Sequence, residues 1–155
     1  MKFFIYHVDS SIISGFRNPG YTSTFSTQGT YTHTIKKISS NICQFRLDFD
    51  EFEIIKPNIN TVTPPSDCPT DTLTVKEVNF ECFRAIGIIL QQLQGLDKTS
   101  VNYPPVYCGI GTGMHMYLQA HPAENVDASI EISLGASTEA RKWSIRVTQV
   151  KLLAI

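Results

Sequence analysis

Residues 41–54 read Asn41-Ile42-Cys43-Gln44-Phe45-Arg46-Leu47-Asp48-Phe49-Asp50-Glu51-Phe52-Glu53-Ile54. From Cys43 to Phe49 apolar side chains alternate with polar ones, which is the period of a strand with one buried and one solvated face. After Asp50 the apolar positions move to Phe52 and Ile54, an odd step from Phe49 that changes the phase of the inward set. The stretch therefore predicts a core strand with a β-bulge near Asp50-Glu51, of the kind found in single-domain β-sandwiches.

The bulk properties of the chain fit one globular domain. Its 155 residues are enough to bury a core, and the formal net charge of −1 gives no long-range field that would favour nucleic acid or a membrane surface. No apolar run reaches the roughly 18 residues that a membrane span requires. The apolar N-terminal run ends at His7-Val8-Asp9 without a cleavage site, so we read residues 1–14 as a leader of unclear status and not as a signal peptide.

Short alternating stretches separated by turn signals predict further strands. They cover residues 30–35, 71–75, 114–119, 130–134 and 143–147. We expect the 30–35 strand to form a hairpin with the strand at 41–54, through the polar turn at 36–40. Strands at this spacing predict an all-β fold in which two antiparallel sheets form a sandwich.

Residues 81–95 differ in kind from the rest of the chain. Their apolar side chains recur at intervals of three and four, which is the period of a helix. These side chains are Phe83, Ile86, Ile89, Leu90, Leu93 and Leu96. The pattern predicts one amphipathic helix that packs on a sheet and ends near Gly95, although Gly87 in its middle costs about 1 kcal/mol.

We expect no catalytic residue, cofactor site or metal site. Position 114, where a dinucleotide fingerprint has its last glycine, is Met, and no helix pattern follows, so the glycines of 109–113 predict a turn with unusual backbone angles. The acidic residues of 48–53 alternate onto a solvated face and lack the spacing of a calcium loop. The histidines share no spacing and are expected at the surface, whereas Trp143, Met114 and Met116 are expected in the core. No motif sets a nucleophile beside a base.

The four cysteines stand at positions 43, 68, 82 and 108 and match no metal or redox spacing. For an intracellular chain, free thiols buried in the core are the first interpretation, and disulfides are the alternative.

Several phrases, taken in order along the chain, resemble a CUB domain, in particular the divergent CUB-like modules of arthropod secreted proteins. They are Asn18-Pro19-Gly20-Tyr21, Leu47-x-Phe49-x-x-Phe52-x-Ile54, Cys68-Pro69-Thr70-Asp71-Thr72-Leu73-Thr74-Val75, Cys108-Gly109 and Trp143-Ser144-Ile145-Arg146-Val147. The resemblance covers residues 15–150, with 79–102 as an insertion, and the tail at 151–155 stands where the family has a terminal cysteine region.

The resemblance implies a jelly-roll-like sandwich with a disulfide between Cys68 and Cys108. In the chain-entropy model, closing this loop of about 41 residues contributes about 4 kcal/mol. The cysteines that the family carries near residues 31 and 38 are absent, so Cys43 lacks its usual partner. Asp71 matches one of three acidic positions of calcium-binding members, but Ile55 stands at the first and no aspartate follows Leu134. Calcium binding is therefore not carried over.

For function, the resemblance implies a noncatalytic extracellular interaction module that binds a protein or a glycan through loops such as 56–67 and 119–128. Its oligomeric state is left open, and no nucleic-acid partner is expected. One alternative is an accessory fragment of a secreted CUB-bearing protease, and another is an intracellular lectin-like sandwich with reduced cysteines. The lack of a recognisable signal peptide, the insertion and the tail together give the hypothesis that the chain is a partial or imperfect version of a longer secreted protein.

Overall fold

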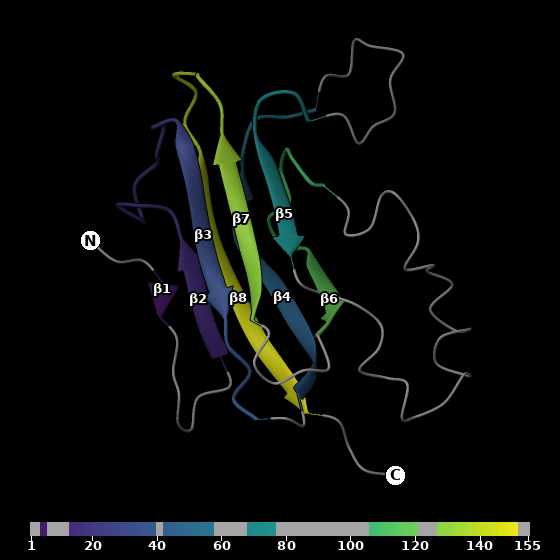
Figure 1. Ribbon diagram of the computed structural model, residues 1–155. Coiled ribbons are helices and arrows are strands. Elements are labelled where there is room, and N and C mark those ends of the chain that lie inside the picture. The colour runs from purple at the N-terminus through teal and green to yellow at the C-terminus, as the bar shows by residue number, and fades with distance from the viewer. Residues whose placement is uncertain are drawn as a thin grey trace.

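The computed structural model describes residues 4–5, 13–39, 42–57, 68–76, 106–120 and 127–151, which form eight β-strands (Figure 1). The strands are β1 (Phe4–Ile5), β2 (Ile13–Arg17), β3 (Gly29–Ile35), β4 (Ile42–Glu53), β5 (Thr72–Lys76), β6 (His115–Gln119), β7 (Ala128–Leu134) and β8 (Lys142–Lys151). The predicted all-β class is confirmed. The helix predicted at 81–95 lies outside the described residues. In the described part of the chain, no helix has the length and apolar character to cross a membrane.

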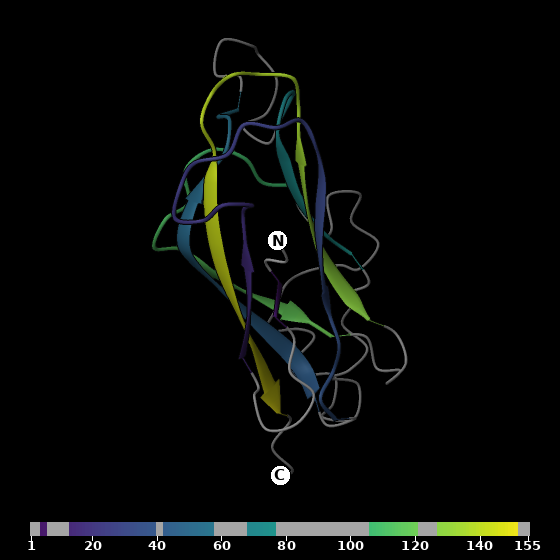
Figure 2. The ribbon, with the colours of Figure 1, turned by 90° about the vertical axis from the view of Figure 1, so that its left-hand side faces the viewer.

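The strands form two antiparallel sheets. The larger sheet has the order β1-β2-β8-β4-β6, and the smaller has the order β3-β7-β5. Figure 2 shows the two sheets as facing layers, which gives the molecule the form of a sandwich. The hairpin expected between residues 30–35 and 41–54 is wrong, because β3 pairs with β7 and β4 pairs with β8 and β6. Alternation identifies the buried face of a strand but not the strand beside it.

β4 lies between β8 and β6 and contains the predicted bulge. Its register against β8 shifts between Phe49 and Glu51, and Asp50 is exposed. Phe49 and Phe52 are both buried, so the extra residue restores the inward phase after the bulge. The bulge predicted from the change of phase is confirmed.

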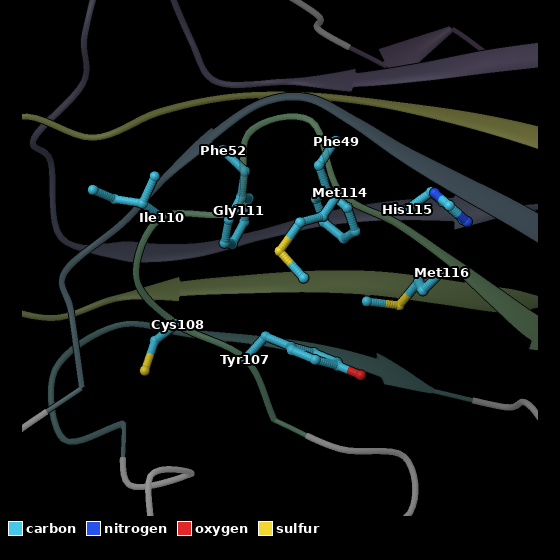
Figure 3. Close-up of a pocket in the computed structure, with 9 residues that line it drawn as sticks. All are labelled: Phe49, Phe52, Tyr107, Cys108, Ile110, Gly111, Met114, His115 and Met116. Carbon is cyan, nitrogen blue, oxygen red and sulfur yellow. The ribbon is translucent and has the colours of Figure 1, made fainter.

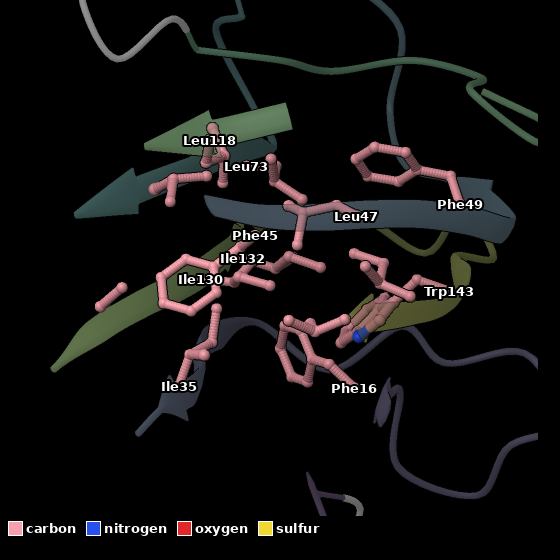
Figure 4. Close-up of a cluster of buried hydrophobic side chains, with 14 of the residues drawn as sticks. Phe16, Ile35, Phe45, Leu47, Phe49, Leu73, Leu118, Ile130, Ile132 and Trp143 are labelled. Atoms are coloured by element: carbon pink, nitrogen blue, oxygen red, sulfur yellow. The ribbon is translucent and has the colours of Figure 1, made fainter. Parts of the chain in front are cut away.

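The core between the sheets is filled from the inward positions of both layers (Figure 4). Trp143 of β8 is fully buried and meets the rings of Phe16 and Phe25 edge-on. The backbone N–H of Trp143 donates to Oδ1 of buried Asn18 at 2.9 Å. Asn18 begins the predicted turn, in which Gly20 has a φ of 73°. This side chain therefore ties the turn to the centre of the core.

A second buried polar contact lies at one end of the sandwich. Arg141 and Asp71 are fully buried, and Nε and Nη2 of Arg141 donate to the two carboxylate oxygens at 2.8 and 2.9 Å. The remaining guanidinium donors reach the backbone carbonyls of Ser26, Gly135, Ser137 and Glu139. A bidentate pair of this kind is among the stronger hydrogen-bonded contacts in proteins.

The carboxylate of Asp71 is also satisfied from the backbone. It accepts the N–H of Ile55 at 2.9 Å and the N–H of Gly135 at 3.0 Å. Burial raises the pKa of Asp71, but the hydrogen bonds from Arg141, Ile55 and Gly135 outweigh it and leave the pKa below its ordinary value. The carboxylate is therefore ionised and stabilises the fold at neutral pH.

His33 of β3 is fully buried, so the expectation of a surface histidine is wrong. Its ring stacks on Phe16 with 5.6 Å between the ring centroids, and Nε2 lies 3.1 Å from the hydroxyl of Ser14. Burial lowers the pKa of His33 from 6.5 to about 4. The ring is therefore neutral in the folded protein at neutral pH.

Replacing Arg141 by Met should lower the free energy of unfolding by about 3–5 kcal/mol, because Asp71 is left as a buried charge without its partner. Urea denaturation followed by the fluorescence of Trp143 measures the loss. Lys76→Met is the matched control, since it removes the surface ion pair between Lys76 and Glu131 at 3.0 Å and should cost less than about 1 kcal/mol. Similar small losses in both variants would show that the buried pair is not a major support.

The neutral ring of His33 should make stability fall in mild acid. The unfolded ring takes up a proton as the pH falls through about 6.5, whereas the folded ring resists until about 4, so about 3 kcal/mol is lost between these values. His33→Gln should lose this part of the pH dependence in urea denaturation at pH 7 and pH 4.5. Thr34→Gln, at an exposed position of the same strand, should keep the wild-type profile. An unchanged profile in His33→Gln would contradict the assignment.

Candidate functional site

Residues 106–114 cross the edge of the sandwich and are attached to both sheets. Tyr107 exchanges backbone hydrogen bonds of 2.8 and 3.0 Å with Leu73 of β5 in the smaller sheet. Gly111 donates to the carbonyl of Phe52 in the larger sheet at 2.9 Å. Gly109 and Gly113 have φ angles of 96° and 87°, so the turn with unusual backbone angles predicted for these glycines is confirmed. The segment is therefore fixed at both sides.

A pocket of about 170 Å³ lies beneath this segment (Figure 3). Its lining is mostly apolar and comes from β4, β6 and the segment itself. The lining residues are Phe49, Phe52, Tyr107, Cys108, Ile110, Gly111, Met114, His115 and Met116. Phe49 and Phe52 stand on either side of the β4 bulge with 5.2 Å between their ring centroids. Figure 3 shows the side chains of Met114 and Met116 directed into the space between β4 and Tyr107.

Most of the large exposed apolar side chains of the described residues belong to one stretch of the chain, and two of them, Ile110 and Met114, line the pocket. Five large ones are more than a third exposed, and four of them belong to residues 106–117. These four are Val106 at 39%, Ile110 at 56%, Met114 at 58% and Tyr117 at 49%. We call them, with the pocket, the 106–117 patch. Clusters of exposed apolar side chains mark interaction surfaces in soluble proteins.

Met114 corrects the sequence prediction, which placed it in the core. The strand β6 begins at His115, so Met114 still belongs to the turn that Gly113 forms. Its side chain lies at the rim of the pocket and is mostly exposed. Met116 and Leu118 do turn inward, since Met116 is half-buried and Leu118 is buried. The alternation was therefore extended one residue too far.

The disulfide that the resemblance implies is present. Cys68 and Cys108 are bonded with their Cα atoms 5.9 Å apart, and Cys108 is part of the pocket wall. The bond joins the chain before β5 to the segment that crosses the edge. The side chains of Cys43 and Cys82 lie outside the described residues.

Three of the four acidic residues of β4 form ion pairs with cations of the larger sheet. Asp48 binds Arg46 at 3.0 Å, Asp50 binds Arg146 at 3.1 Å and Glu51 binds Lys142 at 3.1 Å. The hydroxyl of Tyr21 donates to Glu51, which lowers the pKa of Glu51 and raises the pKa of Tyr21. Among the described residues, no group of three or more His, Cys, Asp or Glu side chains could hold a metal ion. These three carboxylates are therefore neutralised within the sheet.

The positions compared with calcium-binding CUB domains converge in space. Ile55, Asp71 and Gly135, the residue after Leu134, meet at one point, because both backbone N–H groups donate to the Asp71 carboxylate. The positive charge that Asp71 faces there is the guanidinium of Arg141. Most of loops 56–67 and 119–128, where binding was expected, lies outside the described residues.

No protein-family model matches the chain, and no curated protein sequence matches it. The resemblance to CUB domains and to arthropod secreted proteins therefore stays a prediction.

Loss of the disulfide should weaken the fold. The double variant Cys68→Ser/Cys108→Ser should lose about 4 kcal/mol of unfolding free energy in urea, because the unfolded chain is no longer closed into a loop. A nonreducing peptide map of protein from its native host should recover the two cysteines in one linked peptide pair. Free thiols at both positions in that material would contradict the bond.

Proposed function

We propose that this protein is a noncatalytic extracellular module that binds a partner protein through the 106–117 patch. The observation that carries the proposal is that four of the five exposed large apolar side chains of the described residues belong to residues 106–117, and that two of them, Ile110 and Met114, line one apolar pocket. Burying such side chains against a partner releases them from water, which is the main favourable contribution to protein association. An apolar lining favours a protein partner over a glycan.

The construction of the patch supports recognition. Its main chain is attached to both sheets, and the disulfide lies in the pocket wall, so little order has to be gained on binding. The two methionines at the pocket are flexible and can adapt to the shape of what they meet. Among the described residues of the lining, Tyr107 and His115 are the ones with polar side chains, and burial raises the pKa of the Tyr107 hydroxyl. This is a lining for apolar contact and not for acid–base chemistry.

The disulfide supports the extracellular location. Disulfides of this kind persist in oxidising compartments and are rare in the cytosol, which disfavours the alternative of an intracellular sandwich with reduced cysteines. The finer assignment to a jelly-roll-like CUB fold is part of the proposal. It is supported by the two facing sheets, the Cys68–Cys108 bond and the convergence of Ile55, Asp71 and Gly135.

The test compares retention of extracellular proteins from the native host by immobilised wild-type protein and by Ile110→Asp/Met114→Asp. Charges at these two positions make the patch unfavourable to bury, so proteins retained by the wild type should be lost from the double variant. Both side chains are mostly exposed, and the fold should survive in urea denaturation.

Ile13→Asp is the matched control, because Ile13 is the remaining exposed large apolar side chain among the described residues and lies on β2, outside the pocket lining. It should retain the same proteins as the wild type. Equal retention by all three proteins, or no specific retention by any of them, would overturn the proposed function.

A further inference from the structure

We infer that the partner presents an extended, uncharged segment that pairs with the outer edge of β6 and places one large apolar side chain in the pocket. This inference rests on the proposed function and specifies how the partner is held.

The first argument is the state of the β6 edge. β6 ends the larger sheet, and no strand of the described residues pairs with its outer side. His115 and Tyr117 are exposed and Met116 is half-buried, whereas Leu118 and Gln119 are buried, so the accessible edge is the start of the strand. Natural sheets protect such edges with charged side chains, proline or very short strands. β6 reads His-Met-Tyr-Leu-Gln and has no proline, lysine, arginine or carboxylate.

The other sheet ends differ from β6. β1 has only two residues. β5 has Lys76 in an ion pair with Glu131, and its Leu73 already pairs with Tyr107. β3 also has no proline and no lysine, arginine or carboxylate, but none of its residues lines the pocket. Among these ends, β6 alone contributes residues to the lining of the pocket.

The second argument is the direction of the side chains on β6. Met116 faces Leu47 of β4 across the sheet and shares its inward side, where the pocket lies. The rings of His115 and Tyr117 contact each other, with 5.8 Å between their centroids, on the side of the strand that alternates with Met116. In a strand added to this edge, the residue opposite Met116 has its Cβ roughly 5 Å from that of Met116 and points to the same side. The side chain of that partner residue enters the pocket. The side chains of its two neighbours in the added strand contact His115 and Tyr117 on the solvated face.

The third argument is the match of size and charge. A cavity of about 150 Å³ with an apolar lining accepts benzene, so a pocket of about 170 Å³ accommodates one Phe, Leu or Met side chain. Among the described residues, those that line the pocket include no lysine, arginine or carboxylate. At the edge itself, Arg46 donates to the Tyr117 hydroxyl at 2.9 Å and is already neutralised by Asp48. A neutral edge beside an apolar pocket suits a neutral segment with an apolar anchor, which is strand addition in its usual form.

The experiment uses two phage-displayed libraries of linear peptides, one with a fixed central Phe and one with a fixed central Asp, flanked by random residues. The folded wild-type protein and Ile13→Asp should enrich the Phe library and not the Asp library. Ile110→Asp and Met116→Lys should enrich neither. Because Met116 is half-buried, the exposed variant Ile110→Asp keeps the test valid if Met116→Lys fails to fold.

The best peptide is then titrated into isotope-labelled protein by nuclear magnetic resonance. The backbone amides of 115–117 and the methyl groups of Met114 and Met116 should shift together. Methylation of the peptide backbone nitrogens next to the anchor, or replacement of the anchor by Ala, should weaken binding at least about tenfold.

Three outcomes would overturn the inference: equal binding of the backbone-methylated peptide, enrichment of the Asp library, or a concentration-dependent dimer of this chain that perturbs the same amides. Failure of every peptide to bind while the host protein is still retained through the patch would also overturn it and would leave the proposed function standing.

Discussion

The buried pair between Arg141 and Asp71 is the contact on which the arrangement of the described strands depends. The guanidinium donates hydrogen bonds to four backbone carbonyls, and the carboxylate accepts hydrogen bonds from the backbone N–H groups of Ile55 and Gly135. The end of β4, the start of β5 and the turn between β7 and β8 therefore meet at one charge pair. Such an arrangement specifies the relative position of the two sheets, which apolar contacts alone would fix less sharply.

The pocket follows from the same contact. Asp71 stands three residues after Cys68, so the pair that fixes Asp71 also positions the disulfide that reaches Cys108. Cys108 then holds the segment that covers the gap between the sheets. The Arg141–Asp71 pair and the disulfide thus fix the backbone of the apolar surface at this edge. The shape of that surface does not depend on the side chains that a partner would meet.

Local features of the fold could be predicted from the sequence. The change of phase after Phe49 indicated the bulge, and the glycines of 109–113 indicated their turn. His33 shares its side of β3 with Ile35, so its burial had a signal in the alternation that was overlooked. The partner of Arg141 had none, because the two charges are 70 residues apart and nothing local distinguishes this arginine from a solvated one. The pocket likewise depends on which segments meet, which neither periodicity nor composition reports.

The bulge at Asp50 has a consequence for how this surface can vary. A residue inserted or lost elsewhere in β4 would turn the following side chains from one face to the other. At the bulge a residue can be lost while Phe52 and Ile54 still face inward, because the regular alternation is restored. Phe49 and Phe52 flank that point and form one wall of the pocket, so a change in chain length there alters the bend between them. A change of chain length at this bulge can therefore reshape the pocket wall without turning Phe52 and Ile54 out of the core.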